Sequence, residues 1–345
     1  DNFKNRLFGA KILIKECTNL RFNNFFYVSS KEVFTKKPNY KHLISLNWHS
    51  IGRFLENKIE SCIAIDFGST TTDFICIKNN KIVNKFTDDY SRINNTELLY
   101  TGFTRTPIFG VTNQIDYNKK KLKIIPEFFS NTSDIYRVLG RLNKKIDLDD
   151  TADKSRKNIT QSLIRLSRSF GFDYKSKNLK KLKVISQKIS SIQLNQIFQI
   201  TLELQKKFLL KNQPVVISGI GQDVLYNYLK KNKLKTFYFK QFLNKSRLNK
   251  EASFHAPAVS IALLLQRLKW RDIFFNFLVS TSDILLLNLQ IADLNPRIFG
   301  LSFINKGMWV SFKEPARPIF MSNFLHLEMN LLRLEILQND KRSPL

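Results

Sequence analysis

The chain has 345 residues and a hydrophobic content of 43%, which is enough for a sizeable core in one or two domains. Its formal net charge is +28, but lysine and arginine are spread along the whole sequence rather than gathered in one stretch. We interpret this charge as a bias of the composition, and we expect weak, salt-dependent binding to nucleic acid without a specific nucleic-acid partner. Three scattered cysteines without metal-ligand spacing indicate neither a disulfide framework nor a zinc site, which favours a reduced, cytoplasmic protein.

No stretch of the sequence has the pattern of a signal peptide or of a membrane span. The most apolar window, residues 273–291, carries Asn276, Asp283 and Asn288, so we expect no membrane association. The chain opens on Asp1 without a methionine, so we expect an upstream segment to be missing.

Residues 1–60 alternate short apolar runs with basic loops and end in a helical pattern. Asn47 is a suitable N-cap residue, and Trp48, Ile51 and Leu55 follow it at helical spacing. His49 lies at the start of this helix, where it is either a site residue or a histidine packed beside Trp48. The spacing alone leaves both interpretations open.

Residues 63–75 form the most informative stretch, in which one apolar run leads into Asp66 and a second follows Asp73. This pattern predicts two strands joined by a tight turn, with Cys62 and Cys76 facing each other as core residues. Backbone N–H groups and hydroxyls at such a turn can hold an anionic oxygen, and the two carboxylates can hold a metal. The turn residues are Gly68, Ser69, Thr70, Thr71 and Thr72. The alternative is a hairpin whose turn is simply rich in serine and threonine.

We expect a strand over residues 81–86 and a polar loop over residues 87–92. A further polar loop, residues 101–107, comes after them. It reads Thr-Gly-x-Thr-Arg-Thr-Pro and contains Thr101, Gly102 and Arg105. The planar guanidinium of arginine binds phosphate or carboxylate oxygens in pairs, so this loop suits an anion. The alternative is an ordinary solvated turn.

Helical patterns dominate the middle of the chain. We expect helices over residues 134–142, capped by Ser133, and over residues 157–170, ending at Gly171. Lys157, Arg165 and Arg168 are interpreted as solvated. The acidic cluster at residues 147–153, which includes Asp153, is interpreted as a metal site, as a partner of Arg156, or as carboxylates that complement a helix dipole.

A second glycine turn lies further along the chain, after two predicted helices over residues 179–189 and 192–210. A buried strand from Pro214 runs into a turn formed by Ser218, Gly219 and Gly221, and a helix follows over residues 222–231. This is how α/β proteins present backbone to a ligand at the edge of a sheet, although such turns also serve packing alone. A short strand over residues 236–239 and a helix over residues 256–265 complete the regular pattern.

With these two glycine turns at the ends of strands, the sequence resembles proteins of the fold shared by sugar kinases, actin and the heat-shock chaperone ATPases. Within that superfamily the sequence resembles the hydantoinase A/oxoprolinase family, and more narrowly its tetrahydromethanopterin-linked one-carbon-transfer group. The motifs that carry the resemblance stand in the family's order and spacing. They are residues 47–49, 66–73, 97–107, 126–137, 151–153 and 256–258.

This resemblance implies a two-lobed α/β fold of the ribonuclease H-like kind. We expect residues 1–60 to be the remnant of a first lobe, residues 61–265 to be the second lobe, and residues 266–345 to be an extension of unknown role. The family's first-lobe Asp-x-Gly-Gly strand has no equivalent before residue 60, so we expect an incomplete first lobe.

The resemblance also implies a reaction, because archaeal members are similar to a synthase of methanofuran biosynthesis. That enzyme joins an aminomethylfuran diphosphate to a phenolic acceptor and releases diphosphate. By this resemblance the loop from Gly68 to Thr72, with Thr101 and Gly102, binds diphosphate together with Mg²⁺ on Asp66 or Asp73. Arg105 clamps the same charge, and His49 and Asp153 are candidates for accepting the phenol proton. The alternatives are ATP-dependent hydrolysis or phosphoryl transfer, and an inactive, truncated binding protein.

Overall fold

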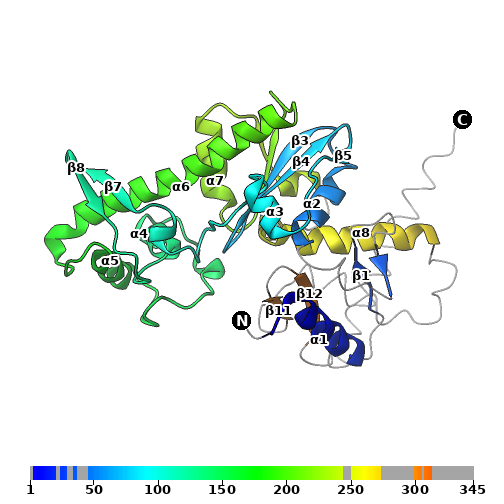
Figure 1. Cartoon of the computed structure of the whole chain (residues 1–345), viewed down its shortest axis with the longest axis horizontal. Coiled ribbons are helices and arrows are strands. Elements are labelled where there is room, and N and C mark those ends of the chain that lie inside the picture. Colours follow the sequence, from blue (N-terminus) through cyan, green and yellow to red (C-terminus); the bar gives the residue numbers. More distant parts are fainter. Residues whose placement is uncertain are drawn as a thin grey trace, which may run out of the picture. The chain divides into compact units, whose positions relative to one another are not determined.

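The computed structural model describes residues 3–20, 24–28, 34–36, 46–243, 250–272, 299–304 and 307–312 (Figure 1). The mixture of helices and sheets confirms the α/β class. The chain divides into two compact units, residues 1–292 with 304–308, and residues 293–303 with 309–345. The apolar window at residues 273–291 and most of the predicted extension lie outside the described residues. Within the described part of the chain, no helix is long and apolar enough to cross a bilayer.

A six-stranded mixed sheet organises the first unit, and the predicted hairpin forms its centre. Its order is β10-β9-β3-β4-β5, with β6 also paired to β4. β3 pairs parallel to β9 and antiparallel to β4, which places Asp66 directly opposite Asp73. The strand bounds are β3 Cys62–Phe67, β4 Thr72–Lys78, β5 Lys81–Ile82, β6 Leu98–Leu99, β9 Val215–Ser218 and β10 Thr236–Tyr238.

The two faces of this sheet bury different cores. One face packs with helices α2 (Asn47–Leu55) and α8 (Ala256–Asp272), and the other packs with α6 (Leu179–Lys207) and α7 (Gln222–Lys231) (Figure 1). Cys62 lies in the first core and Cys76 in the second, because Cys62 is paired with Ile77 and successive side chains alternate between faces. The prediction that the two cysteines face each other is therefore wrong by one residue of register.

A third core lies around the N-terminal half of α6. It combines the hairpin β7 (Gln114–Tyr117) and β8 (Lys120–Lys123) with helices α4 (Thr132–Val138) and α5 (Ile159–Arg168). Figure 1 shows α6 running from this group to the sheet. The two helices predicted over residues 179–210 are thus one helix of 29 residues, because each half has its own core to pack against.

Several local predictions need correction. Asn47 is the first residue of α2, and the N-cap is Leu46, which makes no side-chain cap hydrogen bond. Asn131 rather than Ser133 caps α4, because its side chain and that of Asp134 form a reciprocal capping box. The polar loop predicted at residues 87–92 contains helix α3 (Asp89–Asn94), and the strand predicted at 81–86 ends at Ile82.

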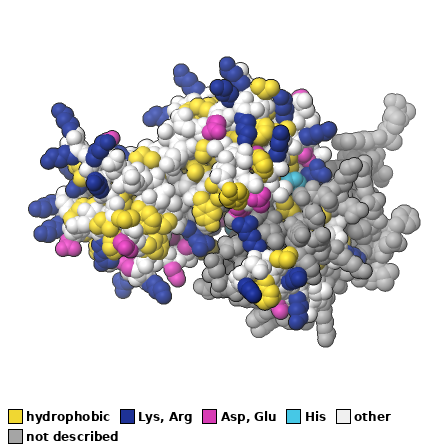
Figure 2. Space-filling model, viewed as in Figure 1, with side chains coloured by type: hydrophobic (Ala, Val, Ile, Leu, Met, Phe, Trp, Pro, Cys, Tyr) yellow, Lys and Arg dark blue, Asp and Glu magenta, His cyan; other side chains and the backbone are white. Residues whose placement is uncertain are grey.

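The remaining elements are short or lie outside the sheet. They are α1 Arg6–Asn19, β1 Phe26–Tyr27, β2 Phe34–Thr35, β11 Phe299–Ile304, β12 Gly307–Phe312, and the 3₁₀ helices Ile108–Gly110, Lys144–Ile146, Ser176–Asn178, Phe239–Phe242 and Lys250–His255. β1 pairs with β2, and β11 pairs with β12. Figure 2 shows Lys and Arg side chains spread over the visible face of the described part. Such a distribution attracts anionic small molecules from many directions.

Candidate functional site

A pair of buried carboxylates lies at the turn end of the β3–β4 hairpin. Asp66 and Asp73 are direct cross-strand neighbours, and both point to the face of the sheet that packs with α2. Ser218 on β9 donates a hydrogen bond of 2.7 Å from Oγ to Asp66 Oδ1. Burial, reinforced by the charge of Asp73, raises the pKa of Asp66 to about 7 although the Ser218 hydrogen bond lowers it.

The charge of Asp73 is compensated by Arg92, a residue that the sequence did not single out. Arg92 Nη1 lies 2.7 Å from Asp73 Oδ1, and Nη2 donates to the carbonyl of Glu97 at 3.0 Å. The guanidinium is buried and lies over the Trp48 ring, 4.0 Å from its centroid. The signal that could have placed Arg92 on a helix was Asp88, which accepts a cap hydrogen bond from the Ser91 N–H.

The loop between the two carboxylates presents free backbone donors. The Gly68 N–H donates to the carbonyl of Thr71 at 3.0 Å and closes the turn. The N–H groups of Ser69 and Thr70, and that of Thr71, donate to no partner within the described residues, and all three residues are half-buried. Successive free N–H groups in a turn form a concave anion site, so the geometry agrees with a loop that holds phosphate oxygens.

The second polar loop packs directly behind the first and turns its carbonyls inward. The N–H of Phe103 donates to the carbonyl of Gly68 at 2.8 Å, and the N–H of Arg105 donates to that of Ser69 at 2.9 Å. Because the carbonyls are engaged from behind, the free N–H groups define the open side of the turn. The Arg105 side chain is 54% exposed, and its Nε lies 3.7 Å from a carboxylate oxygen of Asp149. The guanidinium is therefore held only loosely. Because the Arg105 backbone is bonded to Ser69, its side chain starts beside the first loop and can extend toward a ligand there.

Three of the predicted phosphate contacts have a different place in the structure. The Thr72 hydroxyl is buried and donates to the carbonyl of Thr101 at 2.8 Å. The Thr101 hydroxyl accepts from Gln193 at 2.8 Å, and the Gly102 N–H donates to Thr106 Oγ1 at 2.7 Å. Thr72, Thr101 and Gly102 therefore support the loop from beneath. The candidate phosphate site is reduced to Gly68, Ser69, Thr70 and Thr71.

Gly102 has a specific packing role, which gives a first prediction. A Cβ at this position would lie 2.2 Å from the carbonyl oxygen of Ser69 and 2.4 Å from the Thr70 nitrogen, both backbone atoms. Gly102→Ala is therefore expected to destabilise the protein by about 2–3 kcal/mol, measured by urea unfolding, and to weaken Mg-diphosphate binding in calorimetry. Gly110→Ala is the control, because its Cβ would make an ordinary 3.5 Å contact. Equal stability of the two variants would contradict the packing of the two loops.

The glycine turn after β9 meets the same strand end. The Gly221 N–H donates to the carbonyl of Phe67 at 3.0 Å, and the Gly219 N–H donates to that of Ser253 at 2.9 Å. Gly219 has a φ of +87°, and a Cβ there would lie 2.4 Å from the Phe67 carbonyl oxygen. The structure thus brings Ser218, Gly219 and Gly221 beside Asp66, as expected of a shared sheet edge. The adjoining Gln222 is fully buried, and neither of its amide atoms has a partner within the described residues.

The two predicted proton acceptors are poorly suited to that role. His49 Nδ1 lies 2.7 Å from the Tyr27 hydroxyl, and burial together with the charges of Arg53 and Arg92 lowers the pKa of His49 to about 4. Burial raises the pKa of Asp153, but hydrogen bonds from Ser155 and the charge of Arg165 outweigh it and lower the pKa to about 2. Both groups are therefore weak bases at neutral pH.

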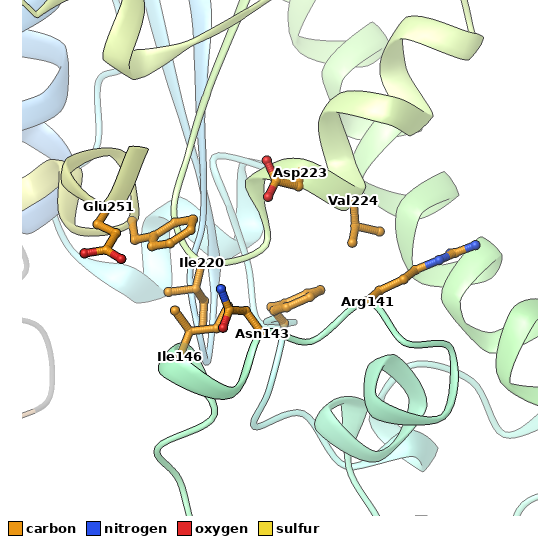
Figure 3. Close-up of a pocket in the computed structure, with 9 residues that line it drawn as sticks. Arg141, Asn143, Ile146, Ile220, Asp223, Val224 and Glu251 are labelled. Carbon is orange, nitrogen blue, oxygen red and sulfur yellow. The ribbon is translucent and has the colours of Figure 1, made fainter. Parts of the chain in front are cut away.

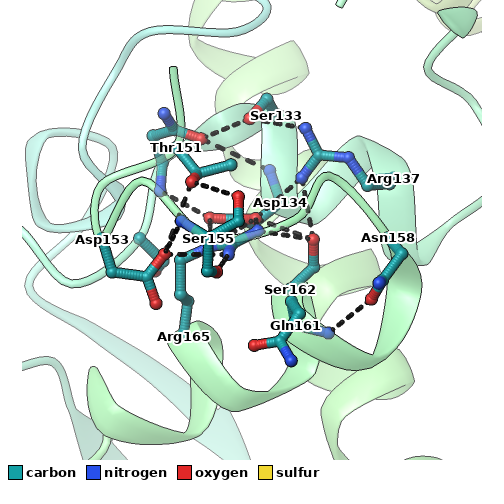
Figure 4. Close-up of polar contacts among 12 residues, drawn as sticks. Ser133, Asp134, Arg137, Thr151, Asp153, Ser155, Asn158, Gln161, Ser162 and Arg165 are labelled. Carbon is teal, nitrogen blue, oxygen red and sulfur yellow. Dashed lines mark hydrogen bonds and ion pairs between the residues drawn. The ribbon is translucent and has the colours of Figure 1, made fainter.

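Asp153 belongs instead to a buried ion cluster beneath the second loop (Figure 4). Asp134, which is fully buried, accepts from Arg137 Nη1 at 2.8 Å and from Arg165 Nη2 at 2.7 Å. Arg165 also pairs with Asp153 at 3.1 Å, and Arg137 pairs with Asp147 at 2.7 Å. The prediction that Arg165 is solvated is therefore wrong, and the arginines that the acidic cluster holds are Arg137, Arg165 and Arg168 rather than Arg156.

The ion cluster fixes the second polar loop through the start of α4. The Ser133 N–H donates to the carbonyl of Thr104 at 3.2 Å, and the Thr132 N–H donates to that of Thr106 at 2.8 Å. The Thr104 hydroxyl donates to Asp149 at 3.1 Å. The cluster at residues 147–153 thus acts on the loop of residues 68–71 indirectly, through the second loop that supports it.

The family of the chain follows from comparison with known proteins. The hydantoinase/oxoprolinase family model matches residues 49–239, which is more than half of the chain and includes both carboxylates, both polar loops and the glycine turn. The chain belongs to the hydantoinase/oxoprolinase family. This confirms the family resemblance of the sequence motifs.

Two relatives of this hydantoinase/oxoprolinase chain are archaeal proteins with the same name. Both are called (4-{4-[2-(gamma-L-glutamylamino)ethyl]phenoxymethyl}furan-2-yl)methanamine synthase. The protein from Methanocaldococcus jannaschii is 29% identical over 242 residues, 70% of this chain and 69% of the relative. The protein from Methanococcus vannielii is 31% identical over 211 residues, 61% of this chain and 93% of the relative.

The carboxylate pair is the predicted place for a metal ion. Among the described residues, no three His, Cys, Asp or Glu side chains are grouped to hold one. Mg²⁺, however, is commonly bound by one or two carboxylates together with substrate phosphates and water. Asp66 fits this pattern because its charge has no cationic partner among the described residues, whereas that of Asp73 is balanced by Arg92.

Proposed function

We propose that the chain is a transferase of coenzyme biosynthesis that joins a furfuryl group to a phenolic oxygen with release of diphosphate. The observation that carries this proposal is the row of free N–H groups at Ser69, Thr70 and Thr71 beside Asp66 and the exposed Arg105. This arrangement suits a diphosphate leaving group. The name of the two synthase relatives contains a phenoxymethyl group on a furan, which is the ether that such a displacement makes.

The chemistry requires stabilisation of charge on the leaving group. The phenolic oxygen forms a bond to the furfuryl methylene carbon, the bond from this carbon to the diphosphate oxygen breaks, and the phenolic proton is lost. Negative charge therefore grows on the diphosphate, where preorganised N–H donors and a guanidinium lower the barrier. Asp66, with Asp73 beside it, would hold Mg²⁺, which neutralises diphosphate charge when bound.

We propose the fold and the domain limits on the same grounds. The family match covers residues 49–239, and the central sheet with both glycine turns lies within it. This supports a two-lobed architecture in which residues 61–265 form the lobe that carries the diphosphate site. Residues 1–60 would then belong to the first lobe, and residues 266–345 would form an extension. The coenzyme would be methanofuran or a close analogue.

The proposed reaction can be tested with the whole chain, Mg²⁺, an aminomethylfuran diphosphate and a phenolic acceptor. We expect diphosphate release and ether formation without ATP. Arg105→Ala is expected to lower kcat/KM about 10²-fold, because it removes one charged donor from the leaving group. Arg156→Ala, an exposed arginine in a nearby loop, is the matched control and should change the rate less than twofold.

The same assay addresses ATP-dependent hydrolysis or phosphoryl transfer, which the family favours as a second function. A loop that holds a diphosphate would also hold the phosphates of a nucleotide. Turnover only with ATP, with ADP as a product, would overturn the transferase proposal and support this second function. Absence of Mg-diphosphate binding in calorimetry would overturn both.

A further inference from the structure

Arg105 is the charged donor of the proposed diphosphate site, and Asp149 is its ion-pair partner. The Nε atom of Arg105 lies 3.7 Å from Asp149 Oδ1, and the two side chains are 54% and 39% exposed. Within the described part of the chain, the Arg105 side chain makes no hydrogen bond. A carboxylate that approaches at Nε leaves Nη1 and Nη2 available, and this pair of donors suits the oxygens of a phosphate group.

The carboxylate of Asp149 is itself held in place by the second polar loop. Thr104, which directly precedes Arg105, is buried and donates from Oγ1 to Asp149 Oδ2 at 3.1 Å. One carboxylate oxygen is thus bonded to a buried hydroxyl, while the other faces Arg105 Nε. Because Asp149 contacts two successive residues of the loop, it gives the Arg105 side chain a fixed point of attachment.

The acidic cluster at residues 147–153 is anchored on both sides of Asp149. Arg137 on α4 pairs with Asp147 at 2.7 Å, and Arg165 on α5 pairs with Asp153 at 3.1 Å. Both arginines are buried members of the ion cluster beneath the second loop. The position of Asp149 is therefore set from three directions, by two helices and by the loop that carries Arg105.

The acidic cluster and the second polar loop meet at a small pocket of about 140 Å³ (Figure 3). Phe103, two residues before Arg105, lines the pocket from the loop, and Ile146 lines it from the start of the cluster. Ile220 of the glycine turn after β9 also contributes to the lining. The ion pair thus lies close along the chain to a cavity beside the glycine turn, which leaves room for the organic group of a diphosphate ester.

We propose that Asp149 is a positioning residue, which holds Arg105 by Nε so that the other two nitrogens of the guanidinium face the diphosphate. This inference rests on the proposed function, in which the diphosphate lies on the loop of residues 68–71. An arginine that becomes ordered only when the ligand arrives loses side-chain entropy on binding, and a carboxylate that orders it beforehand reduces this loss. The negative charge of Asp149 by itself repels diphosphate, so its place beside the site is explained by its action on Arg105.

Calorimetry with Mg-diphosphate and the whole chain separates positioning from a simple effect of charge. Asp149→Asn keeps an acceptor for the Thr104 hydroxyl but loses the charge that attracts Arg105. We expect the affinity to fall about fivefold, whereas the charge effect alone would raise it. Asp150→Asn is the matched control, because it removes the same charge from the next, exposed residue, and it should change the affinity less than twofold. Unchanged or tighter binding by Asp149→Asn would overturn the inference.

A double-mutant cycle shows whether Asp149 acts through Arg105. In a chain that carries Arg105→Ala, Asp149→Asn should cause less than a twofold further loss of affinity, because no guanidinium is left to position. The value of kcat/KM for an aminomethylfuran diphosphate should follow the same pattern. A further loss of about fivefold in the Arg105→Ala chain would assign Asp149 a structural role only and overturn the inference.

NMR of the Arg105 Nε–H group tests the contact without any ligand. Its signal, assigned by its absence from the spectrum of Arg105→Ala, should shift in Asp149→Asn and stay in place in Asp150→Asn. No shift in Asp149→Asn would overturn the inference, because Asp149 would then not hold the guanidinium.

The two proposals can fail separately. Mg-diphosphate binding and diphosphate release that Asp149→Asn leaves unchanged would keep the proposed function and remove the role of Asp149. An Nε–H signal of Arg105 that depends on Asp149, in a chain that binds no Mg-diphosphate, would support the hold on Arg105 and overturn the proposed function.

Discussion

Asp66→Asn is expected to abolish diphosphate release, with a loss of at least about 10³-fold in kcat, while the protein remains folded. Asp66 is the carboxylate we place on the Mg²⁺ ion, and asparagine keeps its shape but not its charge. The Ser218 hydroxyl can still donate to the amide oxygen, so the hydrogen bond of 2.7 Å at Oδ1 is retained. Calorimetry with Mg-diphosphate should show weakened binding in the same variant. Activity within tenfold of wild type would exclude Asp66 from the site.

The pH dependence of stability provides an independent check on this carboxylate. The pKa of Asp66 rises from its ordinary value of 3.8 to about 7 in the folded chain. Between these values the folded state holds a proton that the unfolded state has released, so the free energy of unfolding falls as pH rises. Asp66→Asn removes this loss, and each unit of pKa difference corresponds to about 1.4 kcal/mol. Urea titrations at pH 5 and pH 8 should therefore show the variant gaining stability relative to wild type at pH 8.

Asp73→Asn is the contrasting variant, because the two aspartates have opposite surroundings. Asp73 balances the buried Arg92, so its loss leaves an unpaired guanidinium in the core. We expect a destabilisation of about 3 kcal/mol. If Asp66→Asn lost as much stability at pH 8 as Asp73→Asn, that result would contradict the interpretation that burial disfavours the charged form of Asp66.

The local features of this site were predictable, since they are encoded in short stretches. The β3–β4 hairpin follows from two apolar runs around a glycine, and the turn after β9 follows from a buried strand that ends in Gly219 and Gly221. The family motifs then placed both turns in one site. The helix predicted to end at Gly171 ends earlier, at Arg168 with Ser169 as its C-cap, and Gly171, with a φ of +73°, lies in the turn that follows.

Features that depend on distant partners were not predictable in the same way. A single residue of strand register decides that Cys62 and Cys76 lie on opposite faces, and no local pattern fixes it. Arg92 and Arg165 are charged residues, for which a local pattern predicts a solvent-exposed position. Each is nevertheless buried, because a carboxylate from elsewhere in the chain pairs with its guanidinium. The hydroxyl of Thr72 likewise points beneath the loop, because the carbonyl of Thr101 on the second loop accepts its hydrogen bond.

The ion cluster beneath the second loop leads to the largest expected effect on stability. Within the described part of the chain, Asp134 is the one carboxylate that pairs with both Arg137 and Arg165, so Asp134→Asn removes the negative charge shared by these two buried guanidinium groups. Breaking a buried charge pair in this way costs about 3–5 kcal/mol. Asp134 is also part of the capping box of α4, so the start of that helix is weakened at the same time.

Urea unfolding of Asp134→Asn should therefore show a much lower midpoint than wild type. Lys145→Ala is the control, because it breaks an exposed pair whose side chains are 76% and 49% accessible, and it should change stability by less than about 1 kcal/mol. Without denaturant, at a temperature where the variant is folded, its affinity for Mg-diphosphate should fall as well. The reason is that Ser133 and Thr132 would no longer hold the loop of Thr104 and Thr106 in place. Lost stability with unchanged Mg-diphosphate affinity would show that the cluster supports the fold without organising the phosphate loop.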